Sequence, residues 1–322
     1  SSEANIICET DDGYIWIGSY AGLTRYDGNQ FEFVREGGLV NVVDMMTDSR
    51  GRLWIGTNDA GIARYEQGTY TYFTVADGLS SNSIRCFAED ADGNIYVGTS
   101  NKICRFRPDD TIEVFCQDIS FAKAMTVYQD RLIVMDNKGC LYVLDGKQAQ
   151  GNIVGELNDL FYYCLAPTSR GLMVGTESGE LFIIDISDSG KLKKNRIEVP
   201  ANQISAVFED SRKRIWIAIE NGFGYLLPDG TYEGMSYEGF DSSIVSFHED
   251  YQGNIWAAST HYGVMKLSET SFVNLFDKAG IEKEYVNAVL CYNGDYYCGT
   301  DTALIMNLTS VHQCSFVIMR RL

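Results

Sequence analysis

The sequence has few of the residues that interrupt regular structure or perform acid and base chemistry. Its 322 residues include 4 prolines and 3 histidines, and no segment is of low complexity. Long hydrophobic runs are also missing, since none approaches the roughly 18 consecutive apolar residues that cross a bilayer. Residues 1–10 lack the basic, apolar and small-residue order of a signal peptide. We therefore expect no flexible linker and no direct membrane insertion by this chain.

Positive charge is scarce as well. The chain has 26 basic and 44 acidic residues, which gives a net charge of −18. A protein of this charge repels the phosphates of nucleic acids and the head groups of anionic lipids. The composition therefore predicts a protein that binds no nucleic acid and no anionic membrane surface.

Recognisable catalytic and metal-binding motifs are absent too. The sequence has no His-x-x-x-His, Gly-x-Ser-x-Gly, Walker-type or dinucleotide-binding motif, and its 9 cysteines form no Cys-x-x-Cys pair. Cys8, Cys86, Cys164 and Cys291 lie in apolar stretches, where buried free thiols are common. We expect no catalytic residue, no metal site and no cofactor. Because carboxylates are plentiful, an enzyme that acts on glycans remains an alternative.

What the sequence has in abundance is repetition. One motif recurs eight times at intervals of 37 to 43 residues, most clearly at Ile15 to Ser19 (Ile-Trp-Ile-Gly-Ser), Leu53 to Thr57 and Ile95 to Thr99. A period near 40 residues over the whole chain indicates one repeat architecture, so residues 1–322 are expected to form a single domain. The anchor positions of the eight copies are Trp16, Trp54, Tyr96, Ile133, Met173, Trp216, Trp256 and Tyr297.

One repeat has the pattern of four short strands. Residues 83–115 contain four segments rich in β-branched and aromatic residues, separated by Gly, Asp and Asn, which we call strands A to D. Glycines such as Gly51 and Gly93 suit a tight A–B hairpin, whereas Asp90–Asn94 lacks the spacing of a calcium loop. Four-stranded sheets repeated radially make a β-propeller. The predicted fold class is therefore an all-β propeller of four-stranded antiparallel blades.

The aromatic anchors are expected to be structural. A glycine follows two positions after an anchor, as at Gly18, Gly56 and Gly98, and leaves space where neighbouring sheets converge. His248, beside Phe247 in a strand A, is also expected to be structural. We expect inter-blade packing, rather than a cofactor stack, for the aromatic anchors Trp16, Trp54, Tyr96, Trp216, Trp256 and Tyr297.

The predicted binding face is formed by the loops that join strands B and C. In a propeller these loops and the D-to-A connections gather at one end of the central channel, and function on repeat scaffolds usually lies in variable loops. Their amide, carboxylate and aromatic side chains can bind a polar small molecule such as an oligosaccharide. The candidate ligand-binding residues are Tyr20, Asn58, Asp59, Asn101, Asn137, Glu177, Glu220, Asn221, His261, Tyr262 and Asp301.

The motif resembles the two-component regulator propeller repeat. The pattern is Asp-x-x-Gly-x-Ile/Leu-Trp-Ile-Gly-Thr/Ser, followed by Gly-Leu/Ile-x-Arg-Tyr. Two copies match it closely, at Asp11–Asp27 and Asp48–Glu66, and the copies at 90–106, 210–225 and 250–267 match in part. The resemblance implies an extracytoplasmic sensor propeller of a bacterial receptor, placed ahead of a histidine kinase, a hybrid kinase or a diguanylate cyclase. It implies a small ligand or a partner domain, and a homodimer formed through the full-length receptor. A purely structural dimerisation module is a further alternative.

The number of blades is left open by the sequence. Eight four-strand repeats can be counted, the last ending at Ser315–Met319, and eight blades are slightly favoured because the chain stops as this copy completes. The alternative is seven blades followed by the first blade of a second propeller, which is the habit of the resembled family. The abrupt start at Ser1 suggests a piece of a longer receptor.

Overall fold

The computed structural model is built almost entirely of β-strands. It describes residues 3–35, 37–145, 152–156, 162–187, 192–235, 237, 240, 244–270, 285–292, 295–300, 304–306 and 315–319. Within these ranges the chain forms strands β1 to β31 and one short 3-10 helix, Val75–Asp77. No helix in the described ranges has the length and apolar character of a membrane span.

The first four blades follow one another along the chain, each with its strands paired antiparallel in sequence order. Blade 1 contains β1 (Ile6–Glu9), β2 (Ile15–Ser19), β3 (Gly22–Tyr26) and β4 (Phe31–Val34). Blade 2 contains β5 (Val42–Thr47), β6 (Leu53–Thr57), β7 (Ile62–Glu66) and β8 (Thr69–Phe73). Blade 3 contains β9 (Ile84–Glu89), β10 (Ile95–Thr99), β11 (Ile103–Phe106) and β12 (Ile112–Cys116). Blade 4 contains β13 (Ala122–Tyr128), β14 (Arg131–Asp136), β15 (Cys140–Asp145) and β16 (Asn152–Glu156).

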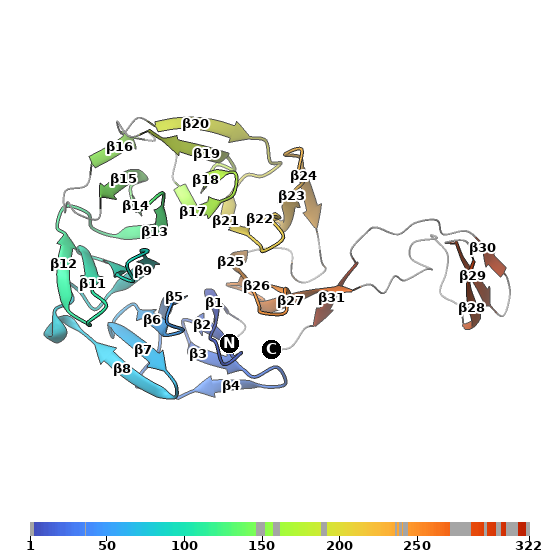
Figure 1. The fold of residues 1–322 in the computed structure, drawn as a ribbon, viewed down its shortest axis with the longest axis horizontal. Coiled ribbons are helices and arrows are strands. Elements are labelled where there is room, and N and C mark those ends of the chain that lie inside the picture. Colours follow the sequence, from blue (N-terminus) through green and yellow to red (C-terminus); the bar gives the residue numbers. More distant parts are fainter. Residues whose placement is uncertain are drawn as a thin grey trace. The chain divides into compact units, whose positions relative to one another are not determined.

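The remaining blades repeat this order up to the last strand of blade 7. Blade 5 contains β17 (Tyr162–Thr168), β18 (Gly171–Thr176), β19 (Leu181–Ile186) and β20 (Leu192–Ile197). Blade 6 contains β21 (Ile204–Glu209), β22 (Ile215–Ile219), β23 (Gly222–Leu226) and β24 (Tyr232–Met235). Blade 7 contains β25 (Ile244–Glu249), β26 (Ile255–Ser259), β27 (Gly263–Thr270) and β31 (Ser315–Met319). In each blade the first strand lies nearest the centre of the ring (Figure 1).

The turn between the first two strands explains the aspartate of the repeat. In blade 2, Asp48 Oδ1 accepts the main-chain N–H groups of Arg50 and Arg52, while Oδ2 accepts the indole N–H of Trp54 at 2.8 Å. The same bond joins Trp216 to Asp210 and Trp256 to Asp250, each at 2.9 Å. One carboxylate therefore closes the turn and orients the buried anchor of the next strand.

The hydrophobic core lies between blades. Trp16 of blade 1 is fully buried in a cluster with Val42 and Leu53 of blade 2. At the junction of the first and last blades, Ile7 packs in one cluster with Trp256. The ring is therefore closed by side-chain packing between residues far apart in the sequence.

On the side of the ring that carries the A–B turns, glutamates form hydrogen bonds between neighbouring blades. Glu89 Oε2 accepts the N–H of Ser49 in the preceding blade at 2.8 Å, and Glu249 accepts that of Ser211 at 2.6 Å. At the closure, Glu9 Oε2 accepts the N–H of Tyr251 at 2.8 Å. One contact type thus links neighbouring blades, including the first and the last.

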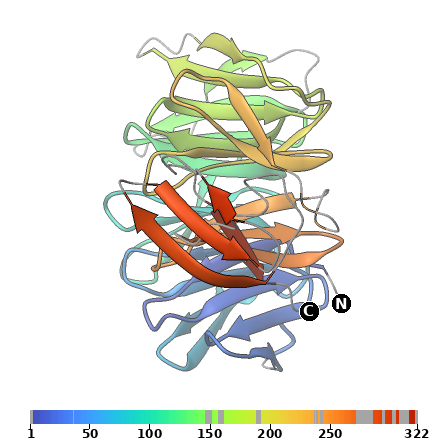
Figure 2. The ribbon, with the colours of Figure 1, turned by 90° about the vertical axis from the view of Figure 1, so that its right-hand side faces the viewer.

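By its contacts the chain divides into two compact units, one up to Met265 and a second comprising Lys266–Met319. In the second unit, β28 (Val286–Tyr292), β29 (Asp295–Thr300) and β30 (Leu304–Met306) form a three-stranded sheet whose strands Figure 2 draws in red. In the same unit β31 pairs with the 266–270 part of β27. The expectation that residues 1–322 form one domain stays a prediction.

The propeller of four-stranded antiparallel blades is confirmed, and the ring has seven blades. The slight preference for eight is corrected, because the eighth copy forms a sheet of only three strands. Its expected fourth strand, Ser315–Met319, pairs instead with Lys266–Thr270 as the fourth strand of blade 7. The physical reason is that the edge of β27 can pair with a further extended segment through main-chain hydrogen bonds.

Candidate functional site

A central cavity of about 650 Å³ is lined by the inner strands of all seven blades. These strands are β1, β5, β9, β13, β17, β21 and β25, which surround the centre of the ring in Figure 1. Most of the wall is apolar, and Met45 and Phe87 are examples. A largely apolar cavity that holds a few polar groups is the usual form of a small-molecule site.

A β-bulge near the start of the inner strands determines which side chains reach this cavity. In six of the seven blades the pairing of the first two strands skips one residue, and the skipped residue sits near the end of the channel where the B–C loops lie. Bulges redirect a side chain and are common beside functional sites. The skipped residues that line the cavity are Val43, Arg85, Lys123, Ser205 and Val245, with Asn5 at the corresponding place before β1.

We call these six residues the bulge ring. Two of its polar members are used to join blades: Asn5 Nδ2 donates to the carbonyl of Val42 at 3.0 Å, and Ser205 Oγ donates to that of Ile244 at 2.5 Å. Both bonds run from one blade to the inner strand of the next. The charge of the bulge ring therefore comes from the two members in blades 3 and 4.

Arg85 brings a guanidinium group to the bulge ring. Its Nη2 donates to Ser83 Oγ at 2.9 Å, and its guanidinium carbon lies 5.6 Å from the centre of the Phe121 ring. Its Nε is buried and has no hydrogen-bond partner among the described residues. Buried charged groups normally have a counter-ion or a full set of hydrogen bonds, so Arg85 keeps unused capacity as a donor.

Lys123 occupies the same position in the next blade. Its Nζ lies 3.8 Å from Glu177 Oε1, which belongs to the B–C turn of blade 5. Burial lowers the pKa of Lys123, and the charge of Glu177 acts in the opposite direction. The cavity mouth therefore carries a second cation whose charge is partly balanced.

Asp44 follows the bulge residue Val43 in β5 and also lines the cavity. Its Oδ2 accepts the N–H of Phe87 in the next blade at 3.0 Å. Burial raises the pKa of Asp44 to about 7, although the N–H groups of Phe87 and Met45 act to lower it. Burial therefore disfavours the charged form of this carboxyl group.

Two of the predicted loop residues reach the bulge ring from blades 1 and 2. Tyr20 is 58 % exposed and lines the mouth of the cavity. Asn58 Oδ1 accepts from Ser83 Oγ at 3.2 Å, and this hydroxyl in turn accepts from Arg85. The B–C loop of blade 2 is thus connected to the arginine of blade 3.

Two further predicted residues lie near the cations of the bulge ring, in blades 4 and 5. The N–H of Asn137 donates to the carbonyl of Phe121 at 3.1 Å, the residue whose ring faces Arg85. Glu177 approaches Lys123, as described above. The structure therefore brings part of the predicted loop set to the side of the channel that carries the positive charge.

Two other predicted residues form hydrogen bonds that hold neighbouring loops together. Glu220 accepts the N–H groups of Asn202 and Gln203 at 3.0 and 3.1 Å. Burial acts to raise the pKa of Glu220, but these bonds outweigh it and the pKa is lowered. Asp59 similarly accepts from the Asn41 amide at 3.2 Å. These carboxylates tie a B–C loop to the preceding D–A connection, which is a structural task.

The last predicted residues lie away from the cavity wall or outside the described ranges. Asn101 donates to a main-chain carbonyl of the preceding connection at 3.2 Å, and Asn221 is exposed in a turn. His261 and Tyr262 are exposed in the B–C turn of blade 7. Asp301 lies outside the described residues. A role in ligand binding for any of these residues remains a prediction.

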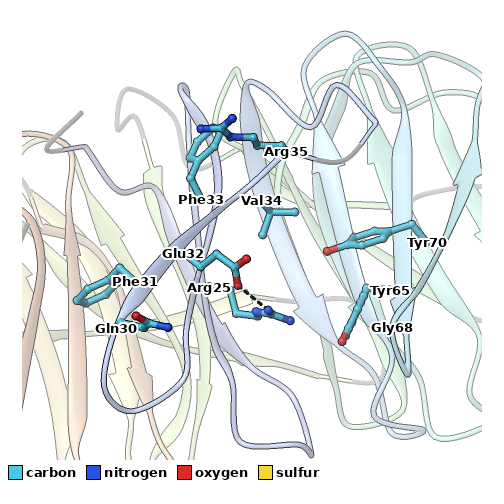
Figure 3. Close-up of a pocket in the computed structure, with 10 residues that line it drawn as sticks. All are labelled: Arg25, Gln30, Phe31, Glu32, Phe33, Val34, Arg35, Tyr65, Gly68 and Tyr70. Atoms are coloured by element: carbon cyan, nitrogen blue, oxygen red, sulfur yellow. Dashed lines mark hydrogen bonds and ion pairs between the residues drawn. The ribbon is translucent and has the colours of Figure 1, made fainter.

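A second hollow of about 780 Å³ lies at the rim, between the outer strands of blades 1 and 2 (Figure 3). Its central cation, Arg25, is already bonded to Glu32 at 2.6 Å and lies 4.3 Å from the Tyr14 ring centre. Tyr65 and Tyr70 form one side, with ring centres 5.1 Å apart. Within this hollow the Arg25 guanidinium is paired with Glu32, and Arg35 also lines it.

The bulge ring was missed by reasoning from loops alone. The available signal was a charged residue inside an apolar segment, as in Ile84-Arg85-Cys86 and Ala122-Lys123-Ala124. An inner strand should otherwise carry few charges, because one of its faces packs in the core. Among the described residues, no group of three His, Cys, Asp or Glu side chains could hold a metal ion.

Comparison with protein families supports the resemblance noted in the sequence. The family model described as two component regulator propeller matches residues 37–59 and 78–101, in blades 2 and 3. The chain therefore carries repeats of this family, and the resemblance is confirmed. The match includes the Asp48 turn of the well-conforming second copy but not the first copy at Asp11–Asp27. No curated protein matches the chain by sequence.

Solved structures share the fold. The extracellular domain of BT4673 from B. thetaiotaomicron, assigned as a hybrid two component system, superposes with a TM-score of 0.69 at 18% identity, over 100% of this chain and 46% of that one. The corresponding domain of BT3049 from the same organism gives 0.71 at 16% identity, over 95% and 46%. A streptogramin B lyase gives 0.68 at 16% identity, over 82% and 92%. At these identities the likeness establishes the fold, and this chain spans less than half of each extracellular domain.

Proposed function

Because the chain carries two component regulator propeller repeats, we propose that it is a ligand-sensing propeller, the input part of a bacterial transmembrane signalling receptor. The fold of the extracellular domains of BT4673 and BT3049 supports this proposal and an extracytoplasmic location. The output of the receptor, a histidine kinase or a diguanylate cyclase, belongs to other parts of such a protein. In this proposal the chain itself performs no catalysis.

The observation that carries the proposal is the set of polar side chains that the bulge ring places at the mouth of the central channel. Its members come from separate blades, so a ligand bound there touches several blades at once. Binding then favours one arrangement of the blades, which is how a ligand shifts a conformational equilibrium. We propose a polar small molecule, with carbohydrates as one class, and signal transmission through the packing of receptor protomers.

The proposal is tested by following the melting temperature of the chain against a panel of neutral and acidic sugars and metabolites. A ligand that binds only the folded state stabilises it by about 2.7 kcal/mol at one hundred times its Kd. Val43→Trp fills the channel mouth and is expected to abolish the shift. Val114→Trp, on the exposed outer strand of blade 3, is the matched control and is expected to keep it.

Three other outcomes would contradict the proposal. Ligand binding that survives Val43→Trp would place recognition elsewhere on the molecule. Conversion of a panel member to product, lost in the same variant, would favour the enzyme alternative over the sensor. If no ligand binds but the chain dimerises in sedimentation, the structural alternative gains support.

A further inference from the structure

The two cations of the bulge ring stand out in a chain of net charge −18. Arg85 and Lys123 lie at equivalent positions of neighbouring inner strands, and both line the cavity. The two strands are in direct contact, since Cys86 Sγ donates to the carbonyl of Ala122 at 3.3 Å. The positive charge is therefore concentrated on one side of the channel mouth.

The other members of the bulge ring show what this position does when it serves only the fold. Asn5 and Ser205 donate to the next blade, and the remaining two positions are occupied by the apolar residues Val43 and Val245. An uncharged side chain satisfies the architecture at these four positions. The fold by itself therefore gives no reason for a charged group at Arg85.

Arg85 also differs from other arginines that lie against aromatic rings. Arg52 and Arg64 lie over the Trp54 ring, and each reaches a carboxylate, Asp48 and Asp110 respectively. Arg85 instead bonds to a neutral hydroxyl, and its buried Nε has no partner among the described residues. A partly buried guanidinium with free donors is suited to an anion that forms two parallel hydrogen bonds.

From this geometry we propose that Arg85, with Lys123 beside it, binds an anionic group of the ligand: a carboxylate, a sulfate or a phosphate on a small polar molecule. This inference rests on the proposed sensing function and specifies its ligand class. The anion sits on the Arg85 side of the mouth. Asp44 of the adjoining blade 2, which accepts the N–H of Phe87, lines the same side of the cavity and offers an acceptor for a hydroxyl group of the ligand.

The test compares ligands that differ only in charge, by calorimetry at constant ionic strength. Glucuronate, galacturonate and glucose 6-sulfate are measured beside glucose and galactose, with inorganic sulfate and phosphate as the bare anions. At least one acidic member is expected to bind more tightly than its neutral counterpart. Arg85→Met is expected to weaken that binding about tenfold or more, because a charge-assisted hydrogen bond is lost.

Matched variants separate the local contact from a change of net charge. Arg107→Met removes one positive charge from the outer C–D turn of blade 3, where Arg107 pairs with Glu113, and is expected to leave the affinity unchanged. Arg85→Lys keeps the positive charge but not the paired N–H donors of the guanidinium group. Its affinity is therefore expected to lie between those of wild type and Arg85→Met. It also serves if Arg85→Met does not fold. Lys123→Met is expected to weaken binding less, because Glu177 already balances part of its charge.

The failures of the two proposals can be told apart. If neutral sugars bind as tightly as acidic ones, Val43→Trp blocks them and Arg85→Met does not, the anion site is wrong while the sensing function stands. If an acidic ligand binds and both Arg85 variants retain full affinity, the anion site is equally overturned. If no member of the panel binds, the result contradicts both proposals.

Discussion

At the scale of single residues, aspartate performs different work according to where the backbone places it. In the A–B turns, as at Asp48, Asp210 and Asp250, its two oxygens accept main-chain N–H groups and an indole N–H. In the channel, Asp44 accepts the main-chain N–H of Phe87 and lines the cavity. The carboxylates of the turn aspartates have their hydrogen bonds supplied by the fold. The charged carboxylate of Asp44 is buried with fewer such bonds and therefore lowers the stability of the folded protein.

Asp44→Asn is expected to stabilise the protein at pH 8 but not at pH 5. Burial raises the pKa of Asp44 to about 7 in the folded protein, so it is the charged form that opposes folding. The stability of the wild type should therefore fall as pH rises from the ordinary aspartate pKa toward 7, and then level off. Denaturant unfolding should show a gain on the order of 1–3 kcal/mol at pH 8.

The control for this prediction is Asp118→Asn, which removes one negative charge from an exposed position. It should change stability little and with no trend between pH 5 and pH 8. A gain for Asp44→Asn that is the same at both pH values would show that desolvation of the carboxylate is not the cause.

At the scale of elements, a blade is completed by its neighbour. The second strands of blades 1 to 7 are buried along nearly their whole length, and the clusters around Trp16 and Trp54 each combine residues of two successive blades. The glycine after the anchor lies where the next inner strand approaches. At Gly56, an added Cβ would lie 2.6 Å from Ile84 Cγ2 and 2.8 Å from Phe87 Cε2 of blade 3.

Gly56→Ala is therefore expected to destabilise the propeller by about 1–3 kcal/mol through overpacking. The matched control is Gly299→Ala, at the same motif position in the eighth copy, where the nearest atom to the added Cβ among the described residues is 4.0 Å away. Denaturant unfolding should show a loss for the first variant and no loss for the second. Equal effects would mean that the glycine is required by the strand itself and not by the adjoining blade.

At the scale of the whole molecule, the ring depends on contacts between its first and last blades. The N–H of Ala4 donates to the carbonyl of Ser259 at 2.9 Å, and Trp256 shares a core cluster with Ile15. Glu9 accepts the N–H of Tyr251 across the same junction. These contacts join positions about one ring apart in sequence, so they form only when every blade is in place.

Glu9→Ala is expected to lower the stability of the ring by about 1–3 kcal/mol, because it removes a charge-assisted bond to a main-chain N–H at the closure. Amide exchange should speed up in β1 and β25 more than in blades 3 and 4. Glu32→Ala is the control, since the exposed Arg25–Glu32 pair should contribute at most about 1 kcal/mol. Uniform acceleration of exchange in all blades would instead indicate that the ring unfolds only as a whole.

Much of the architecture could be predicted from the sequence, because its signals lie between residues close together in the chain. The alternation of apolar and polar residues, the Asp-Gly turn and the anchor with its glycine lie within about 20 residues of one another, so one repeat predicts four strands, and the period predicts a propeller. The structure adds the reason for the aspartate, whose carboxylate reaches Trp54 six positions later. The ligand-binding site was harder to predict from the sequence, because residues of the same loop set have different roles. Tyr20 and Glu177 lie at the channel, whereas Glu220 and Asp59 hold loops in place.

The sequence by itself determined that the chain is an all-β propeller of four-stranded blades, which residues anchor those blades, and which family its repeats resemble. Only the tertiary structure decided that the ring has seven blades, that Ser315–Met319 pairs with Lys266–Thr270, and that Arg85 and Lys123 line the central channel. The reason is physical. Strand patterns follow from neighbours in the chain, whereas ring closure, edge pairing and the channel wall depend on contacts between blades, and no single repeat encodes them.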